Sequence, residues 1–420
     1  MALRKRTFLH DAIDMISMGS HTLESDDFTR CFQPISGIEM DSSGIFYTFS
    51  FLIRYFVLFP ARFAFFAACM AIFCLMVMRY TVTGNIKQLD SAFMFINKSL
   101  MMATNAKIRH IGEKARLNEP HVYVANHTSF FDFMLLSSYK FPHACVSENH
   151  GGLFSFLFKL ILTRNGSIAF KRSERVDRRL VVEKLKVHVQ NTQWAPMLIF
   201  PEGTCVNNKF SVLFQKGAFE LGVAICPVAI KFKRGLFDPY WNRRVHGFAT
   251  HMFYLMTRWR VEAEVRWMQP VRIMKGENPT QFSHRVKILI SKSAGLKNTL
   301  WNGLLKSSPA IKDREMLGEA YLITYGKMAS KGFCKNEQKT DKNKVYLCDE
   351  NIDNTSTRNH LYFEAAIPYK KFQNEVLKEY LRLKELPQTE LKFLLTNHKS
   401  VSDSLKDANG GMFCNCQSKL

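Results

Sequence analysis

The sequence lacks the cysteine spacings of a disulfide framework or a metal-binding motif. Its 10 cysteines are scattered, and none forms a CxxC pair. Such usage is typical of reduced thiols that face a cytosol-like compartment. The start, Met1–Gly19, is basic at Arg4, Lys5 and Arg6, but no apolar run follows promptly. We therefore expect no cleaved signal peptide, no disulfides and no metal site.

Acidic residues are scarce relative to basic ones. The chain has 58 Lys and Arg against 36 Asp and Glu, which gives a formal net charge of +22. Such a surface attracts anions, whether nucleic acid, anionic lipid headgroups or phosphorylated substrates. No recognisable nucleic-acid-reading motif accompanies this charge, and residues 44–80 are intensely apolar. We therefore predict lipid, and no nucleic acid, as a partner.

The apolar stretch 44–80 is interrupted by Arg54, Pro60 and Arg62. Its second half is near the lower length limit for one spanning helix, and its first half is short and carries an arginine. Two arrangements compete: one transmembrane helix preceded by an interfacial helix, or a hairpin bent at Pro60. Basic residues on both sides favour the hairpin. We predict an N-terminal membrane helical hairpin that follows a cytosolic segment, 1–43.

From residue 120 onward, strand-like and helix-like patterns alternate. The runs HVYVA, IAF, MLIF and CPVAIKF predict strands, and Val181, Leu185 and Val189 recur on one face of a helix. This alternation predicts an α/β fold, with a mainly parallel central sheet flanked by helices, over residues 81–305. Residues 306–420 are rich in Lys, Asn, Asp and Ser and predict a largely flexible C-terminal tail.

The strongest chemical signal is the run NHTSFFD at 126–132. Residues five apart do not share a helix face, so His127 and Asp132 meet only if His127 lies on a loop and Asp132 in the next helix's first turn. Asp132 would then fix the imidazole tautomer, and the other ring nitrogen would accept a proton from an alcohol. The same run also fits a helix cap beside an ordinary loop histidine, so both interpretations stay open.

Two further motifs accompany predicted strands. In FPEGT, at 200–204, Gly203 permits close approach of a ligand, Glu202 can accept hydrogen bonds from hydroxyls, and backbone N–H groups can hold an oxyanion. A simple strand-ending turn is the alternative. In FKRS, at 170–173, Arg172 is suited to bind a phosphate, and a solvated basic face is the alternative.

Together and in this order, the three motifs resemble the glycerolipid acyltransferase family, whose blocks are NHxxxxD and a PEGT-type run. HGGL at 150–153, FQKGAFELG at 214–222 and CPVAIKF at 226–232 are similar to the endoplasmic-reticulum glycerol-3-phosphate acyltransferases of types three and four. Departures from the pattern include Phe130 and Phe131, where smaller residues are usual. The resemblance implies that His127 and Asp132 are catalytic. It implies substrate-binding roles for Arg172, Ser173, Glu202, Gly203, Thr204 and Pro227.

The resemblance implies a membrane-bound acyl-CoA:sn-glycerol-3-phosphate 1-O-acyltransferase that makes lysophosphatidate for phospholipid and triacylglycerol synthesis. Its partners would be acyl-CoA as co-substrate, glycerol 3-phosphate and membrane phospholipid, with no cofactor. Alternatives are a lysophosphatidate or other lysophospholipid acyltransferase, and a non-catalytic membrane or lipid-droplet scaffold. The expected location is the endoplasmic reticulum membrane with a cytosol-facing site; lipid droplets, or peroxisomes through the C-terminal Ser418-Lys419-Leu420, are alternatives.

Overall fold

The computed structural model describes Ser17 and residues 27–34, 45–148, 163–170, 175–233, 238–243, 245–337 and 369–386. Two compact units divide the chain: one spans Asp27–Leu305, and the other comprises Met1–Asp26 with Lys306–Leu420. Arg172, Ser173, the HGGL block and the C-terminal tripeptide lie outside the described residues, so the predictions for them stay predictions.

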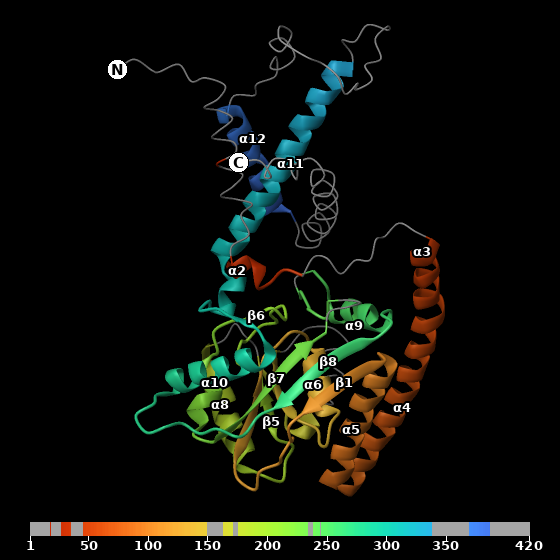
Figure 1. Ribbon diagram of the computed structural model, residues 1–420, viewed down its shortest axis with the longest axis vertical. Coiled ribbons are helices and arrows are strands. Elements are labelled where there is room, and N and C mark those ends of the chain that lie inside the picture. Colours follow the sequence, from red (N-terminus) through yellow and green to blue (C-terminus); the bar gives the residue numbers. More distant parts are fainter. Residues whose placement is uncertain are drawn as a thin grey trace, which may run out of the picture. The chain divides into compact units, whose positions relative to one another are not determined.

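The unit Asp27–Leu305 is built on a seven-stranded sheet within the described residues, in the order β1-β8-β7-β2-β5-β3-β4 (Figure 1). Every neighbouring pair is parallel except β7 and β8, which are antiparallel. The predicted α/β class with a mainly parallel sheet is therefore confirmed. The strands are β1 Ala106–Ile111, β2 His121–Ala125, β3 Ala144–Glu148, β4 Ile168–Phe170, β5 Met197–Ile199, β7 Ala224–Phe232 and β8 Val261–Trp267. Outside this sheet, β6 (Phe210–Ser211) pairs in parallel with β9 (Lys297–Asn298).

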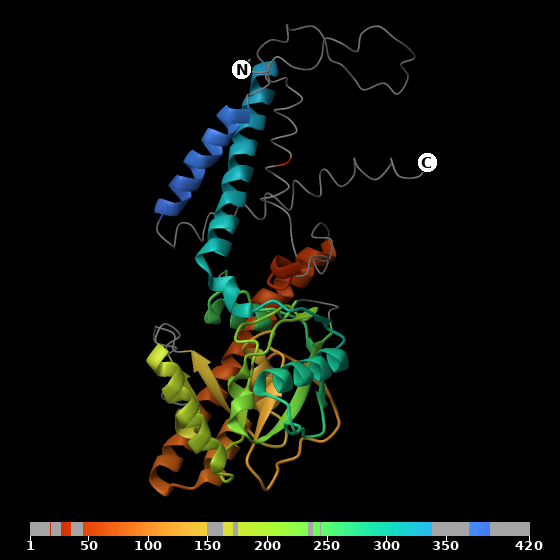
Figure 2. The same ribbon diagram turned by 90° about the vertical axis from the view of Figure 1, so that its left-hand side faces the viewer.

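Helices cover both faces of the sheet (Figures 1 and 2). Side chains alternate across β2, so Tyr123 and Ala125 join one hydrophobic core while Val122 and Val124 join the other. Such two-sided burial is expected of a parallel sheet. The first core is shared with α4 (Phe59–Thr83), α5 (Ile86–Ala103), α6 (Phe131–Ser137) and α9 (Phe248–Met256), and the second with α8 (Arg175–Gln190), η3 (Lys216–Leu221) and α10 (Pro279–Ala294).

The apolar N-terminal segment forms one uninterrupted helical run: α3 (Ile45–Leu52), a π-helix (Ile53–Leu58) and α4. Its span Thr48–Thr83, 36 residues long, is long and apolar enough to cross a membrane. The predicted bend at Pro60 is wrong. The π-type turn shifts the backbone hydrogen-bond register just before Pro60, a residue with no N–H to donate, so the helix continues. The chain turns instead at Gly84, whose φ is 65°.

The second unit contains two described helices, α11 (Pro309–Glu337) and α12 (Tyr369–Glu385). Ala320 and Tyr321 on α11 form a small core with Val376 and Leu383 on α12. The carboxylate of Glu379 accepts a hydrogen bond from Lys327 at 2.8 Å. The polar composition of 306–420 did not anticipate α11, because a narrow apolar stripe is diluted by the charged residues around it.

Candidate active site

The candidate catalytic loops follow two neighbouring parallel strands, β2 and β5, at the carboxyl edge of the sheet, the edge where ligands bind in open α/β folds. The first residue after β2 is Asn126, which is buried. Its side chain continues the β ladder, because Nδ2 donates to Ile230 O at 3.0 Å and Oδ1 accepts from Ile230 N at 2.8 Å. These bonds fix the direction in which the chain leaves the sheet toward His127.

His127 and Asp132 meet as the motif predicts. Nδ1 of His127 lies 3.0 Å from Oδ2 of Asp132, which is in the first turn of α6. The same oxygen accepts from the backbone N–H groups of Thr128 at 2.6 Å and Ser129 at 2.9 Å. One carboxylate therefore orients the imidazole and also holds the loop that leads into α6. The His127 side chain stays 18% exposed, whereas Asp132 is fully buried.

Glu202 connects the two motif loops. Its Oε2 accepts from the backbone N–H of His127 at 2.8 Å, and its Oε1 accepts from Ser211 Oγ at 3.1 Å and Val212 N at 3.3 Å. Burial raises the pKa of Glu202 to about 7, against the opposing influence of these donors. Both oxygens thus bind the protein itself, and the expected contact with an acceptor hydroxyl stays a prediction.

The ring of His127 is held between an aromatic side chain and a thiol. It stacks on Phe200, with centroids 4.2 Å apart and planes 20° apart, and the Cys205 side chain hydrogen-bonds with it. Burial opposes a positive charge on the ring, but the combined influence of Cys205 and Asp132 raises the pKa of His127 to about 10. Its neighbours therefore raise the pKa of the ring, and the side chain stays partly open to solvent.

The turn after β5 requires glycine. Gly203 has a φ of 66°, and its N–H donates to Phe200 O at 3.1 Å, so this donor closes the turn. Gly303 packs against the same turn, because a Cβ placed on it would lie 2.7 Å from Thr204 Cγ2 and 3.0 Å from Glu202 O. No sequence motif marks Gly303, which begins the short 3-10 helix η4 (Gly303–Ser307).

Sequence reasoning also missed His251 on α9. Its Nε2 lies 3.1 Å from Ser129 Oγ, and both side chains are buried. Burial, with the nearby His246, lowers the pKa of His251 to about 3, so the neutral ring accepts from the Ser129 hydroxyl. The neighbouring Phe130 packs on Trp241 and Phe248, with ring centroids 5.1 and 4.3 Å away. His251 thus links α9 to the start of α6, and no local sequence pattern marks that contact.

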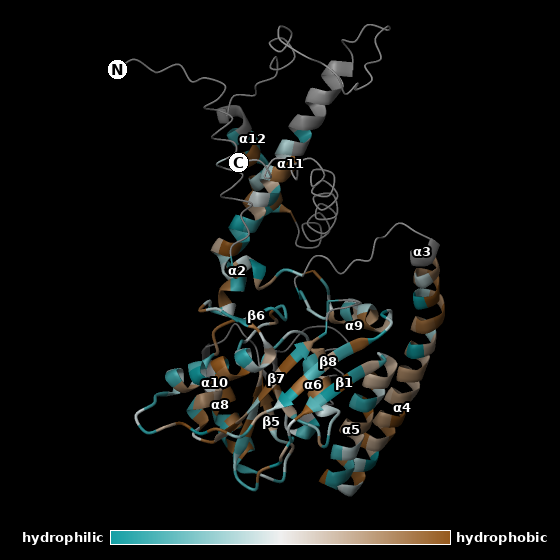
Figure 3. Ribbon diagram, in the orientation of Figure 1, coloured by the Kyte–Doolittle hydropathy of each residue, from teal (hydrophilic) through white to brown (hydrophobic). Residues whose placement is uncertain are grey.

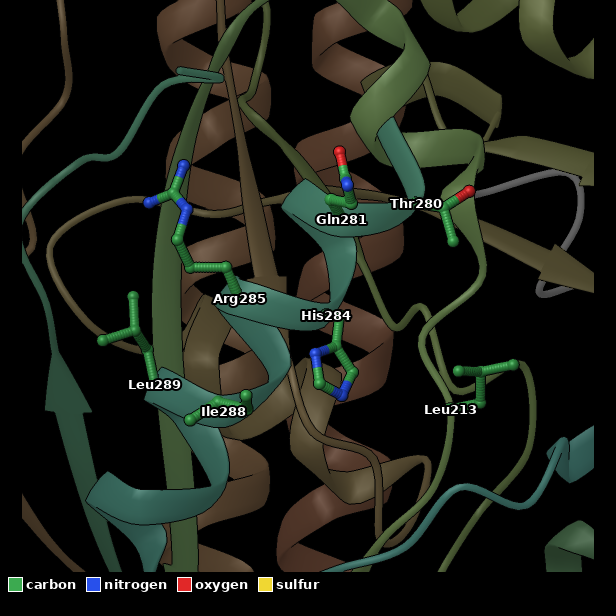
Figure 4. A pocket seen from close by; sticks show the side chains of 7 residues that line it. All are labelled: Leu213, Thr280, Gln281, His284, Arg285, Ile288 and Leu289. Carbon is green, nitrogen blue, oxygen red and sulfur yellow. The ribbon is translucent and has the colours of Figure 1, made fainter. Parts of the chain in front are cut away.

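Pro227 is buried within β7, opposite Val124, and its carbonyl accepts from Met268 N at 3.1 Å. Its role in shaping a substrate pocket stays a prediction. A hollow of about 500 Å³ on α10 contains none of the predicted site residues (Figure 4). It is lined by Leu213, Thr280, Gln281, His284, Arg285, Ile288 and Leu289.

Comparisons with known proteins identify the family. Residues 107–231, which include both motif loops, match the Acyltransferase family model. The chain is 32% identical over 341 residues to glycerol-3-phosphate acyltransferase 4 of Mus musculus, covering 76% of this chain and 73% of that protein. It is 35% identical over 226 residues to glycerol-3-phosphate acyltransferase 3 of Homo sapiens, covering 54% and 51%. A solved structure of the 1-acyl-sn-glycerophosphate acyltransferase PlsC from Thermotoga maritima aligns with 59% of this chain and 94% of its own, at 16% identity and a TM-score of 0.39. The extent of the similarity to the mouse protein shows that the chain belongs to the glycerol-3-phosphate acyltransferase family.

Proposed function

We propose that this protein transfers a fatty acyl group from acyl-CoA to the sn-1 hydroxyl of glycerol 3-phosphate and releases lysophosphatidate and CoA. The observation that carries the proposal is the His127–Asp132 pair, joined at 3.0 Å at the carboxyl edge of the sheet, in a chain of this family. A non-catalytic scaffold has no need of a buried carboxylate aligned with a partly exposed imidazole.

In the proposed reaction, Asp132 holds Nδ1 of His127 protonated, which leaves Nε2 to accept the proton of the acceptor hydroxyl. The resulting oxygen nucleophile attacks the thioester carbonyl, and CoA departs as a thiolate that takes up a proton. Glu202 holds the His127 backbone at 2.8 Å, so the ring meets the hydroxyl in a fixed position. Such alignment is a large part of the catalytic task, because a thiolate is a good leaving group.

Acyl-CoA is the co-substrate, and the proposed steps require no further cofactor. We place the phosphate of the acceptor near Arg172 and Ser173, and the acceptor backbone near Gly203, Thr204 and the Pro227 strand. Support for these roles comes from the match of these residues to the family's motifs.

We further propose that the helical run Thr48–Thr83 attaches the protein to the endoplasmic reticulum membrane, with the site facing the cytosol. Its length and composition suit a bilayer, and its outer face carries exposed apolar side chains such as Phe56, at 69%, and Leu75, at 61%. Figure 3 shows this apolar character along α3 and α4. Imaging of the full-length chain beside markers for the endoplasmic reticulum, lipid droplets and peroxisomes tests the location.

The acceptor is tested with one radiolabelled acyl-CoA and two acceptors, glycerol 3-phosphate and lysophosphatidate, given separately to the purified full-length protein. We expect labelled lysophosphatidate from the first acceptor. Transfer to lysophosphatidate alone would establish the runner-up activity, and transfer to neither, by a folded preparation, would favour the scaffold.

A further inference from the structure

The loop Thr257–Arg260, between α9 and β8, is fastened to the apolar helix at two points. The guanidinium of Arg62, on α4, donates to the carbonyl oxygens of Met256 at 2.8 Å and Trp259 at 3.1 Å, and also to that of Arg258. The indole N–H of Trp259 donates to Ser50 Oγ at 3.1 Å. An arginine that interrupts the apolar run therefore caps the end of α9 and holds this loop along the helix.

Arg258 in this loop has no acidic partner. Its guanidinium lies over the Tyr254 ring, 3.8 Å from the centroid, and among the described residues no side chain or carbonyl accepts a hydrogen bond from it. Its Nε is buried and unpaired. Arg260, two residues on, has the same buried and unpaired Nε, but its terminal nitrogen is paired with Glu262 at 2.5 Å. The terminal nitrogens of the Arg258 guanidinium are not among the buried unpaired atoms, so an acceptor from outside the chain can reach them.

The surroundings of Arg258 match the boundary between hydrocarbon and water. Trp259 is 40% exposed and Phe253 is 38% exposed, and the adjacent helix presents Phe49 at 64% and Phe56 at 69%. Phe253 packs on Phe59 of that helix, with ring centroids 4.5 Å apart. Tryptophan beside arginine, next to an apolar helix, is the composition that proteins place at the headgroup level of a bilayer.

We propose that Arg258 binds the phosphate of an anionic phospholipid at the membrane surface, beside the indole of Trp259. The planar guanidinium can bind two phosphate oxygens at once, and its position over the Tyr254 ring restrains it. The bound lipid holds the α9–β8 loop at headgroup depth, and with it α9, which carries His251 of the candidate site. This inference rests on the membrane attachment in the proposed function, but not on the reaction.

Energy transfer from tryptophan to pyrene-labelled phosphatidylserine tests the site in the full-length protein, purified in neutral detergent micelles that contain increasing fractions of this lipid. Trp259→Phe should remove the signal that comes from the site. Arg258→Gln should raise the half-saturating lipid fraction about fivefold, as expected for one basic side chain at an anionic surface. Arg258→Lys keeps the charge but cannot bind two phosphate oxygens at once. Its half-saturating lipid fraction should therefore lie between those of the wild type and Arg258→Gln.

The matched control is Arg109→Gln, which also removes one positive charge, from a side chain 71% exposed on β1, and should bind lipid as the wild type does. Pyrene-labelled diacylglycerol, which has no phosphate, should show no dependence on Arg258. Equal lipid binding by Arg258→Gln and wild type overturns the proposal, as does an equal loss in Arg109→Gln or full displacement by excess inorganic phosphate, which would mark a free-anion site. Acyl transfer in micelles without phosphatidylserine is measured alongside. Activity retained by Arg258→Gln shows that the variant is folded. No activity in the wild type would count against the proposed function, while the lipid-binding result would still stand.

Discussion

Replacing Glu202 with glutamine separates two roles for this carboxylate. In the structure it accepts three hydrogen bonds, from His127 N at 2.8 Å, Ser211 Oγ at 3.1 Å and Val212 N at 3.3 Å. An amide has one accepting end and one donating end, so in either orientation its NH₂ group faces a donor. The unsatisfied donor costs about 1–3 kcal/mol. If the His127 loop shifts by about 1 Å as a result, the rate falls about 100-fold.

Steady-state acyl transfer over a range of glycerol 3-phosphate concentrations measures the effect. A residue that positions His127 should lower kcat about 100-fold and leave KM for the acceptor nearly unchanged. A residue that binds the acceptor should raise KM instead. Ser211→Ala is the matched control, because it removes one donor to Glu202 and leaves the bond to His127 in place; its kcat should stay close to that of the wild type. An unchanged kcat in Glu202→Gln would refute the positioning role.

The same substitution has a pH signature. Burial raises the pKa of Glu202 from 4.5 to about 7 in the folded protein, so folding favours the protonated carboxyl. This contribution to stability is complete below pH 4.5 and is lost as pH rises through 7; it amounts to about 3 kcal/mol. Glutamine does not titrate, so the wild type should lose thermal stability relative to Glu202→Gln across this interval. Parallel melting curves for the two proteins would contradict the assignment.

Three further substitutions test the rest of the site. Asp132→Asn should lower the rate of acyl transfer about 100- to 10,000-fold in single-turnover assays, because the amide can stabilise the wrong imidazole tautomer; a near-normal rate would rule out the pair. Cys205→Ala removes a group that raises the pKa of His127, so the acid limb of the kcat/KM profile should move to lower pH, and an unmoved limb would show that the thiol does not influence the base. His251→Phe leaves the buried Ser129 hydroxyl without its acceptor and should destabilise the fold by about 1–3 kcal/mol; His251→Gln, which can still accept, should recover part of the lost melting temperature.

The sequence predicted the α/β sheet and the meeting of His127 with Asp132 because both depend on local pattern. The strands HVYVA and CPVAIKF are short apolar runs, and a five-residue spacing allows contact only across a loop-to-helix junction. The prediction of a bend at Pro60 was wrong because the feature that decides it leaves no pattern in the sequence. Proline usually ends a helix, but a π-type turn before it changes which donors the helix needs, and nothing in a single sequence marks such a turn.

The remaining features of the site depend on contacts between distant segments. Gly303 packs on Thr204, and His251 reaches Ser129 across 122 positions, so neither follows from spacing along the chain. The FPEGT motif marks Glu202 as a candidate, but its bond to the His127 backbone joins two loops 75 positions apart in the sequence. The same holds for Arg62. In the sequence it only interrupts an apolar run, and its hydrogen bonds to the carbonyls of Met256 and Trp259 join segments far apart in the chain.

The most direct test of the central claim is acyl transfer by His127→Ala in the purified full-length protein, with labelled acyl-CoA and glycerol 3-phosphate. The variant should melt close to the wild type, because a partly exposed ring is lost while the Glu202 bond to the backbone N–H remains. Its kcat should fall at least about 100-fold, the contribution expected of a general base. Wild-type turnover by a pure, folded His127→Ala protein would contradict the account.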